Sequence, residues 1–398
     1  MGFFRGRAER RTATLSQLTA IAERAGGSTA GVFVDADSAN RHHAWWAAKE
    51  LVAGVGSSLP LDEFRKVGDT QVPVALSSLF ADPDPDPSIT AQGWRAQLLR
   101  SVIARGNAYA YLTGWEQTGY AQQATTIHPD RVTWRRGESG RLETLLDGKP
   151  IDRWPLGPLW HFGLYQEAGS PVGMSPIEYH RNTIGGALAA QQYGHKTFMN
   201  GAPAWAVNVR QGPTKDELDA LTRDIFNSAT SGGVVTVPSE LSFEKLTISP
   251  ADSQFIDSQR LGVEDIARII LGGFVELIGG SVSGGSLTYA NREQRMADFT
   301  ALSLAPRYLV PFEAALSQLV PRGRYVKHNL DALMRADLKA RYESYKLAAE
   351  VSDLMGEPML TIDEMRDFEN LARLSDVQRS SFTPLRRPAA PTQGGTIA

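Results

Sequence analysis

The stretch LGGFVELIGGSVSGGSLTYANRE (Leu271–Glu293) is the most informative about the fold, because it places a glycine-rich loop between two long helical patterns. Six glycines occur between Gly272 and Gly285, and no lysine or arginine occurs between Gly272 and Ala290. Glycine allows backbone conformations that other residues avoid. The stretch is therefore predicted to be a mobile loop of low charge, with Glu276 as its one carboxylate.

The sequence on each side of this loop predicts a helix. Apolar residues recur at helical spacing over about 251–271 and again from about Tyr289 to Leu319, a run that contains Pro306. A short strand over Gly323–Leu330, a helix over Leu333–Met355 and a second helix over Thr361–Leu371 follow. Thr361 and Glu364 have the spacing of a capping box.

Another long helix is predicted upstream, from Pro176 to about Met199. Ser175 and Glu178 form a capping-box pattern in front of it, and Asn200-Gly201 is a typical helix end. Glycines inside a helix weaken it, so their presence indicates a surface that another backbone approaches closely; a merely poor helix is the alternative. The candidate packing residues are Gly185, Gly186, Ala189, Ala190 and Gly194.

A small α/β insert is predicted between the helices at 176–199 and 251–271. Its pattern is a strand AWAVNV, a helix from Thr214 to about Ser228 with Glu217 completing a capping box, and two more strands, GGVVTVP and LSFEKLTIS.

Residues 39–170 are predicted to form an α+β unit. Trp45, Ala48, Val52 and Val55 recur at helical spacing, and both Trp45 and Trp46 are expected in the core. An extended, solvated acidic connector is expected over Asp82–Ser88. The remaining elements are a helix over Ile89–Ala104 capped by Ser88, a turn at Gly106-Asn107, and short strands in AYAYL, ATTIHPDRVTWRR and PLWHFGL.

Composition excludes several classes of protein. The 398 residues have globular composition, 42% hydrophobic and 21% charged, and cysteine is absent, so disulfides and thiolate chemistry are excluded. The net charge of −3 argues against bulk attraction to DNA or anionic membranes. Neither a signal peptide nor a run long enough to span a membrane is found, so the protein is expected in the cytoplasm or in a particle assembled there.

The motifs of common enzymes are not found. The Gly/Ser loop has no nearby lysine for a phosphate cradle, and neither GGSVS nor GGSLT completes a nucleophile elbow. The seven histidines lack metal-ligand spacing, and the adjacent His42 and His43 are expected to point to different sides of a helix. We therefore expect no catalytic residue, no metal site and no cofactor, although a hydrolase that uses the Gly/Ser loop stays open as an alternative.

The order of these elements and several short words resemble the portal proteins of long-tailed bacteriophages and related prophages. The words are RGNAYAYL, IHPDRVTWRR, GMSPIEYHR, FMNGAPAWAVNV, LTYANREQ and LTIDEMRDFENL. The resemblance covers roughly residues 40–375 and implies a portal-type α+β subunit. Its parts would be a flexible N-terminal arm (1–38), a wing (39–170 and 289–332), two stem helices (171–200 and 249–271), a clip (201–248), a tunnel loop (272–288), a helical crown (333–376) and a disordered tail (377–398).

The resemblance also implies a function and partners. The family forms a ring, usually of twelve subunits, at one capsid vertex, and double-stranded DNA passes through it during packaging and ejection. The expected partners are the large terminase subunit, a head–tail adaptor, and the major capsid and scaffold proteins, without a membrane; the expected location is the virion, after assembly in the host cytoplasm. The clip contacts would be made by Trp205, Asn208, Arg210 and Glu240. The tunnel loop would contribute Gly279, Gly280, Ser281, Val282, Ser283, Gly284, Gly285 and Ser286.

The charge of the loop agrees with that function. Each basic contact to phosphate would hold sliding DNA more firmly, whereas a loop of glycines and small hydroxyls can touch DNA without holding it. Small residues on the stem suit close packing in a closed ring. A structural scaffold that forms oligomers but conducts no DNA is the second alternative.

Overall fold

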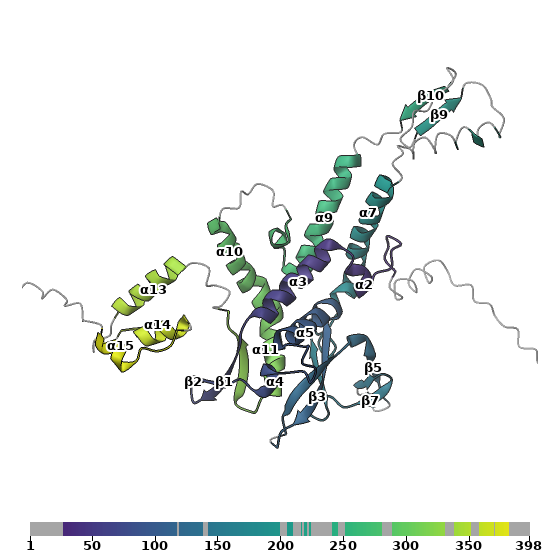
Figure 1. Ribbon diagram of the computed structural model, residues 1–398. Helices are drawn as coiled ribbons and strands as arrows, with labels where there is room; N and C mark the ends of the chain where they lie inside the picture. Colours follow the sequence, from purple (N-terminus) through teal and green to yellow (C-terminus); the bar gives the residue numbers. More distant parts are fainter. Residues whose placement is uncertain are drawn as a thin grey trace, which may run out of the picture. The chain divides into compact units, whose positions relative to one another are not determined.

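The computed structural model describes two stretches of the chain, 27–330 and 338–381. The gaps in the first are residue 118, residues 138–141, 200–204, 246–250 and 281–288, and most of 210–240; the gaps in the second are 352–357 and 370. The chain divides into two compact units, one ending at Leu330 and the other beginning at Asp331 (Figure 1).

Two helices that pack against each other form the centre of the first unit, α3 (His43–Ser58) and α5 (Ala91–Arg105). Trp45, Ala48 and Val52 are completely buried, which confirms the predicted helical face. Trp46 was expected in the core but is 50% exposed, with the Lys49 ammonium 4.3 Å from its ring centroid. Consecutive helical residues point about 100° apart, so only one of the two tryptophans can face the core.

The start of α5 differs from the prediction by two residues. Thr90, rather than Ser88, caps the helix: its hydroxyl oxygen accepts from the Gly93 N–H at 3.1 Å. The Ser88 hydroxyl instead donates to Asp86 at 2.7 Å, inside the acidic connector. Short polar side chains often close such local turns and so compete with a capping role.

The connector before α5 is less exposed than expected. Asp84 is buried, and the carbonyl of Pro83 accepts from the Ala124 N–H at 2.6 Å. The connector is therefore held against strand β4 (Ala121–Ile127). The short helix α4 (Ser78–Ala81), which precedes it, packs on the same strand.

Three antiparallel strands lie beside α5 in the order β4-β3-β8, where β3 is Asn107–Trp115 and β8 is Leu159–Gly163. The period-two pattern predicted this strand, but Ala108, Tyr109 and Ala110 are all buried. Because successive side chains of a strand point to opposite faces, both faces of β3 are covered over these residues. A second small sheet has the order β5 (Val132–Arg136), β6 (Leu142–Leu146), β7 (Lys149–Ile151), and the helical turn η1 (Pro129–Arg131) leads into it.

A third sheet joins distant parts of the chain. Its order is β11-β1-β2, where β1 is Leu61–Val67, β2 is Thr70–Val74 and β11 is Arg324–His328, the strand predicted within Gly323–Leu330. Glu63 of β1 is buried, and its carboxylate lies 3.1 Å from the Arg324 guanidinium. The same carboxylate accepts from the Ser77 N–H and hydroxyl. Residues 61 and 328 are therefore neighbours in space.

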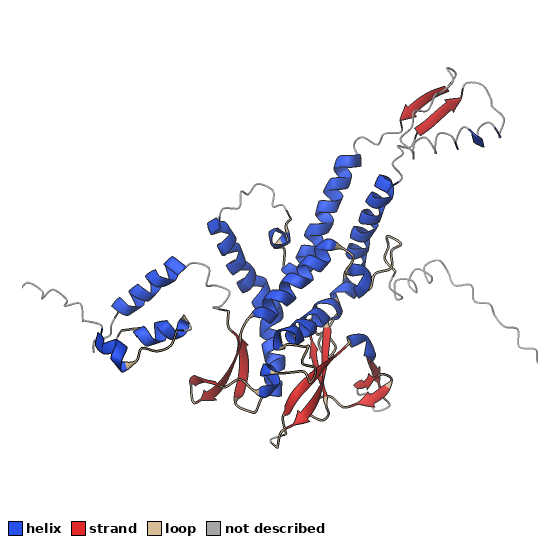
Figure 2. Ribbon diagram, viewed as in Figure 1, coloured by secondary structure: helices blue, strands red, loops and turns tan. Residues whose placement is uncertain are grey.

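Long helices extend from these sheets (Figure 2). The single helix predicted over 176–199 is two helices, α6 (Pro176–Tyr179) and α7 (Arg181–Met199), separated by His180 with φ −106° and ψ 25°. Helix α9 (Ala251–Leu271) has the predicted bounds and packs against α7 and α3. Between them, β9 (Trp205–Val209) pairs antiparallel with β10 (Leu241–Lys245). The predicted helix over 214–228, its capping box and the strand GGVVTVP lie wholly or mostly outside the described residues.

The helix predicted from Tyr289 to Leu319 changes its geometry along its length. It begins as α10 (Tyr289–Phe299), continues as the π-helix η3 (Thr300–Leu309) and α11 (Val310–Leu316), and ends in a 3-10 turn, η4 (Ser317–Leu319). Pro306 lies inside the π-helical segment. Proline removes a backbone donor from a helix, and wide π turns are one way of accommodating such a break.

The first and last described segments show order where little was expected. Residues 27–39, assigned to the flexible arm and the start of the wing, form a bridge between Gly27 and Phe33 and the short helix α2 (Ala36–Ala39), capped by Asp35. In the second unit, α13 (Leu338–Glu350) and α14 (Ile362–Phe368) are followed by α15 (Asp376–Ser381), which lies at the beginning of the expected tail. The predicted capping box of Thr361 and Glu364 is confirmed.

Candidate functional site

The base of the glycine-rich loop is built at the end of α9. Gly272 and Gly273 have φ of +72° and +102°, values that L side chains rarely adopt, so the chain turns sharply after Leu271. A 3-10 turn, η2 (Val275–Ile278), follows and ends at Gly279, again with positive φ. A side chain at Gly280 would lie against the Val275 side chain. The first nine residues of the predicted loop therefore have a defined backbone.

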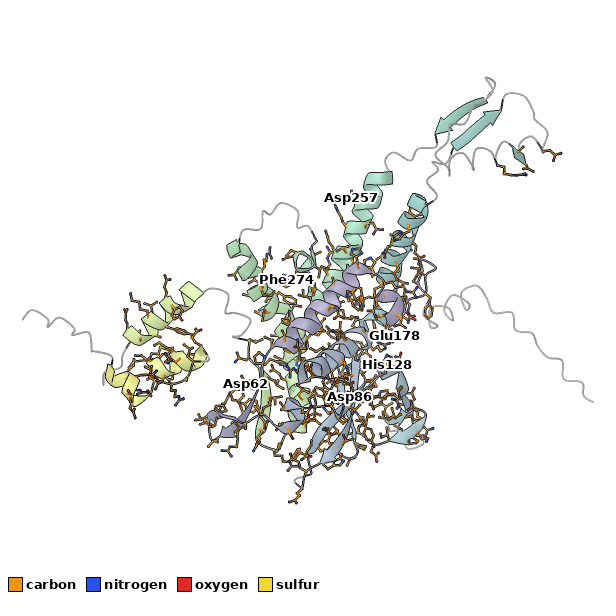
Figure 3. All side chains as sticks on the ribbon, viewed as in Figure 1. Asp62, Asp86, His128, Glu178, Asp257 and Phe274 are labelled. Atoms are coloured by element: carbon orange, nitrogen blue, oxygen red, sulfur yellow. The ribbon has the colours of Figure 1, made fainter. Side chains whose placement is uncertain are left out.

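Two contacts join this base to α10, the helix on the far side of the loop. Phe274, which is labelled in Figure 3, packs edge-on against Phe299, and their ring centroids are 5.6 Å apart. Glu276 was predicted as the single carboxylate of a mobile lining, but its side chain is only 7% exposed and lies 3.6 Å from the Arg295 guanidinium. The negative charge of Glu276 is thus paired with a cation at the base of the loop.

Arg307 and Tyr308, neighbours in the π-helix, hold the end of α9. The Arg307 guanidinium donates to the carbonyls of Ile269 and Ile270 at 2.6 and 3.2 Å, and the Tyr308 hydroxyl donates to Ile270 at 2.8 Å. Burial raises the pKa of Tyr308 well above its usual value. The last carbonyls of a helix lack intrahelical partners, and a cation there also complements the helix dipole. Sequence analysis did not find either residue.

The candidate loop residues are only partly within the described chain. Gly279 and Gly280 belong to the base, as given above. The other six lie outside the described residues: Ser281, Val282, Ser283, Gly284, Gly285 and Ser286.

The small residues of α7 face different neighbours. A side chain at Gly185 would lie 2.4 Å from the side chain of Ser28, so this glycine makes room for the N-terminal segment and not for a second helix of the subunit. Nothing lies within 4 Å of a side chain built at Gly186. Helix α9 approaches closely at Gly262, where a side chain built on the glycine would lie 3.4 Å from the side chain of Ala187. Ala189 and Ala190 are partly exposed, and Gly194 is buried.

Two of the four candidate clip residues lie within the described chain. Trp205 and Asn208 belong to β9, where they pair with Lys245 and Ser242. Arg210 and Glu240 lie outside the described residues.

The segment that leads into α6 and α7, here called the root, is fixed to the rest of the first unit at the turn between α5 and β3. The Asn107 side chain donates to the Gly173 carbonyl at 2.9 Å and accepts from the Gly173 N–H at 2.8 Å. The Ser175 hydroxyl donates to the Ala104 carbonyl at 3.0 Å, and its oxygen accepts from the Glu178 N–H. Gly106 has φ +70°, and a side chain there would collide with the Met174 carbonyl. Two of the portal-like words, RGNAYAYL and GMSPIEYHR, therefore meet here.

A histidine completes this root. His161 Nε2 lies 2.9 Å from Asn107 Oδ1, and because that oxygen already accepts from Gly173, Nε2 is assigned as the donor. Its ring stacks on Tyr109 with centroids 4.8 Å apart. Burial, with a smaller contribution from the charge of Arg153, lowers the pKa of His161 to about 3.

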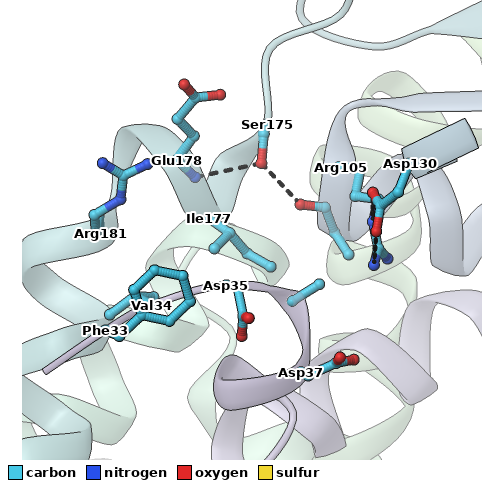
Figure 4. Close-up of a pocket in the computed structure, with 12 residues that line it drawn as sticks. Phe33, Val34, Asp35, Asp37, Arg105, Asp130, Ser175, Ile177, Glu178 and Arg181 are labelled. Carbon is cyan, nitrogen blue, oxygen red and sulfur yellow. Dashed lines mark hydrogen bonds and ion pairs between the residues drawn. The ribbon is translucent and has the colours of Figure 1, made fainter. Parts of the chain in front are cut away.

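A cleft of about 320 Å³ lies beside the root, between residues 33–37, the end of α5 and α6 (Figure 4). Three of its charged side chains have partners: Arg105 lies 2.8 Å from Asp130, and Asp35 caps α2. The Ser175 hydroxyl is occupied by Ala104, so the cleft offers no activated nucleophile. Its contacts connect parts of the subunit.

The remaining histidines do not form a metal site. His42 and His43 were expected on different sides of a helix, yet their rings stack with centroids 4.8 Å apart, because His42 precedes the first helical turn. Burial lowers the pKa of His42 to about 4. Among the described residues no group of His, Asp or Glu could hold a metal ion. Within the same residues, no helix has the length and apolar character needed to cross a membrane.

Comparison with solved structures shows that the fold is similar to that of a phage portal protein and of a chain in a gene transfer agent neck. The crystal structure of an HK97-family phage portal protein from Corynebacterium diphtheriae matches this chain with a TM-score of 0.57 and 16% identity. The match covers 75% of this chain and 96% of that protein chain. A chain in the neck of a native gene transfer agent particle, computed with C12 symmetry, covers 90% of this chain and 99% of its own, at 18% identity and a TM-score of 0.55.

The sequence comparisons show the family. The family described as "Phage portal protein" matches residues 43–370. The probable portal protein of Streptomyces phage phiC31 is 29% identical over 351 residues, which are 83% of this chain and 75% of that protein. The chain therefore belongs to the phage portal protein family.

Proposed function

We propose that this portal subunit closes into a ring of twelve copies at one capsid vertex, and that double-stranded DNA passes through the ring during packaging and ejection. Family membership over residues 43–370 carries the proposal. The C12 symmetry of the neck that contains a chain of similar fold supports the number twelve. In this proposal the subunit has a structural role and catalyses no reaction.

The parts of the subunit would divide the work. Helices α7 and α9 would form the stem, and the residues around β9 and β10 would form the clip, which binds the large terminase subunit first and the head–tail adaptor later. Trp205, Asn208, Arg210 and Glu240 are the candidate contacts. The major capsid and scaffold proteins would surround the ring, which is assembled in the host cytoplasm and kept in the virion.

The glycine-rich loop would line the channel. Its base is fixed by the Glu276–Arg295 ion pair and by the hydrogen bonds of Arg307 to the end of α9. The residues between that base and α10 carry no charge over 281–288. Phosphate contacts strengthen DNA binding with each added cation. An uncharged loop on a fixed base can therefore follow passing DNA without retaining it.

The first test is electron microscopy of the purified full-length protein, with native mass spectrometry of the same sample. Closed rings with a lumen of duplex width, and a mass of twelve subunits, are expected. Closed oligomers without an open lumen would favour the scaffold alternative and count against the conduit. Turnover of ATP or simple esters at a rate proportional to protein concentration would contradict a purely structural role.

A second test addresses the loop. The variant Ser281→Lys/Ser283→Lys adds two cations to each loop, and Ser281→Asn/Ser283→Asn is the neutral control. Both variants should form rings, but the lysine variant should package DNA more slowly, with a defect that shrinks as salt is raised. Equal packaging by the two variants at low salt would contradict the assignment of the loop to the channel.

A further inference from the structure

The second unit buries very little of its apolar surface. Helices α13 and α14 meet where Tyr345 stacks on Phe368 with centroids 6.4 Å apart, and Tyr342 packs edge-on against Tyr345. None of the described side chains from Tyr342 to Arg379 is buried. Helices of 13 and 7 residues depend on packing for their stability. The described part of this unit therefore needs another surface to complete it.

Two groups of apolar side chains lie on or next to α13, while the exposed Ile362, Leu371 and Val377 lie elsewhere in the unit. The aliphatic face consists of Leu347, Val351 and Met359, which are 63%, 57% and 73% exposed; the Met359 N–H donates to the Val351 carbonyl. The aromatic face consists of Tyr342, Tyr345 and Phe368. Leu347 follows Tyr345 by two positions and Tyr342 by five, so it lies about 200° and about 140° from them around the helix axis. The two faces thus point in nearly opposite directions.

We propose that the aliphatic face of the second unit of one copy packs on the aromatic face of the second unit of the next copy. This inference rests on the proposed ring and assigns a surface to it. A ring needs a head-to-tail interface between two different patches, whereas a single self-complementary patch gives a twofold dimer. The aliphatic face at the end of α13 and the aromatic face where α13 meets α14 are two different patches, so they meet that requirement.

The charges of the two helices favour the same pairing. Helix α13 carries Lys339, Arg341 and Lys346 against Glu343 and Glu350, a net charge of +1. Helix α14 carries Asp363, Glu364 and Asp367 against Arg366, a net charge of −2. Aliphatic faces paired with each other would bring two α13 helices together, and aromatic faces paired with each other would bring two α14 helices together. Head-to-tail packing places α13 beside the oppositely charged α14.

A pair of substitutions tests the aliphatic face in the full-length chain. Leu347→Gln/Val351→Gln removes two apolar contacts, and Lys346→Gln/Glu350→Gln changes the same helix on its charged stripe without changing net charge. The first variant should need at least tenfold more protein than wild type for half-maximal ring formation, measured by native mass spectrometry. The control should assemble like wild type. Equal assembly by the two variants would overturn the proposal.

Cysteine cross-linking tests which faces meet, because the natural chain contains no cysteine. Tyr342→Cys is combined in turn with Leu347→Cys, Val351→Cys or Met359→Cys, and rings are oxidised. The cysteines at 342 and 347 lie on one helix, too far apart for an internal disulfide. At least one pair should give a ladder of cross-linked copies beyond the dimer, and no single-cysteine variant should.

The other outcomes are distinguishable. Dimers from Leu347→Cys alone would show that like faces meet, which contradicts the proposal. Rings in which no pair cross-links would show that another surface, such as the first unit, covers these faces; that result overturns the inference but leaves the proposed ring intact. Failure of wild-type protein to form rings under any condition would instead count against the proposed function.

Discussion

Arg307 is the side chain on which the position of α9 depends most directly. It satisfies two carbonyls that the helix itself cannot satisfy, and it donates a third hydrogen bond to the hydroxyl of Tyr165. Tyr165 has φ +56°, uncommon for a residue with a bulky side chain. This local strain is maintained where the body, the π-helix and the end of α9 meet.

Replacing Arg307 with methionine should lower the free energy of unfolding by about 1–3 kcal/mol, because the carbonyls of Ile269 and Ile270 lose their charged donor. Urea denaturation measures the loss. Arg268→Met is the matched control. Arg268 lies on α9, the helix whose last carbonyls Arg307 binds, and it pairs with Glu264 and Asp265 at the surface. Its loss should therefore cost at most roughly 1 kcal/mol. Equal effects of the two substitutions would contradict the special role of Arg307.

His161 should make the stability of the subunit depend on pH. Its pKa is about 3 in the folded chain and 6.5 as a reference, so below pH 6.5 the unfolded chain binds a proton that the folded chain does not. Stability therefore falls as the pH falls from 6.5 towards 3, by up to roughly 1.4 kcal/mol per pH unit from this group. His42, with a pKa of about 4, acts in the same direction.

The variant His161→Gln keeps a donor for Asn107 but cannot titrate. Denaturation between pH 6.5 and 4.5 should show a smaller loss of stability for this variant than for wild type. His128→Gln, which replaces a histidine at an exposed position, is the matched control. An unchanged slope in His161→Gln would mean that the buried histidine does not control the acid response.

The turn between α5 and β3 holds the start of α6, which leads into α7. Gly106 adopts φ +70° and leaves room for the Met174 carbonyl, while Asn107 bonds both polar groups of the Gly173 backbone. One dipeptide thus ends a helix, begins the central strand of a sheet and holds the start of α6.

Gly106→Ala should lower the free energy of unfolding by well over 2 kcal/mol, because it combines backbone strain of about 1–2 kcal/mol with a collision against Met174. Gly148→Ala is the control, since Gly148 has a similar φ of +77° but nothing within 4 Å of the added atom. The difference between the two variants in urea denaturation isolates the contact at the turn between α5 and β3. Equal losses would mean that strain alone matters there.

Features recorded in local sequence were predicted well. Helix α9 over Ala251–Leu271, the buried face of α3, the glycine turn at Gly106 and the capping box at Thr361 each depend on residues within a few positions of one another. The family resemblance supplied their assembly into a portal subunit. The sequence supplied the composition of the loop, and the structure adds how its base is held.

Features set by distant contacts were missed. The small residues of α7 indicated a surface that another backbone approaches closely, but the pattern did not reveal that Ser28, 157 positions earlier, lies next to Gly185. Arg307 gave no signal because its partners are backbone carbonyls on another helix. Ser88 was predicted to cap α5, but its hydroxyl donates to Asp86 instead. Residue spacing alone does not reveal this competing hydrogen bond. Such contacts have no periodicity that a sequence pattern could reveal.

The two units of the chain differ in how much buried core they contain. The first unit, through Leu330, contains all the sheets of the body and every described buried side chain. Truncation after Leu330 should therefore leave a folded protein with cooperative thermal unfolding. Truncation after Val320 removes β11 and leaves the Glu63 carboxylate buried without Arg324, which should cost roughly 3–5 kcal/mol.

Circular dichroism during heating compares the two truncated proteins. The longer one should retain a sharp transition, and the shorter one should unfold at a markedly lower temperature or fail to fold. A shorter chain as stable as the longer one would show that the β1–β11 pairing does not close the body.

The pairing of β1 with β11 also determines when this sheet can form during synthesis of the chain. The ribosome releases Leu61 more than 250 residues before His328, its partner in the register of the sheet. During that interval the edge of β1 that β11 will later cover has no partner strand, and unpaired strand edges invite aggregation and wrong pairing. Contacts between such distant residues also form slowly. A nascent subunit therefore cannot complete this sheet until α7, α9, the β9–β10 pair and the glycine-rich loop have all been synthesised, so only completed chains would be ready to join the proposed ring.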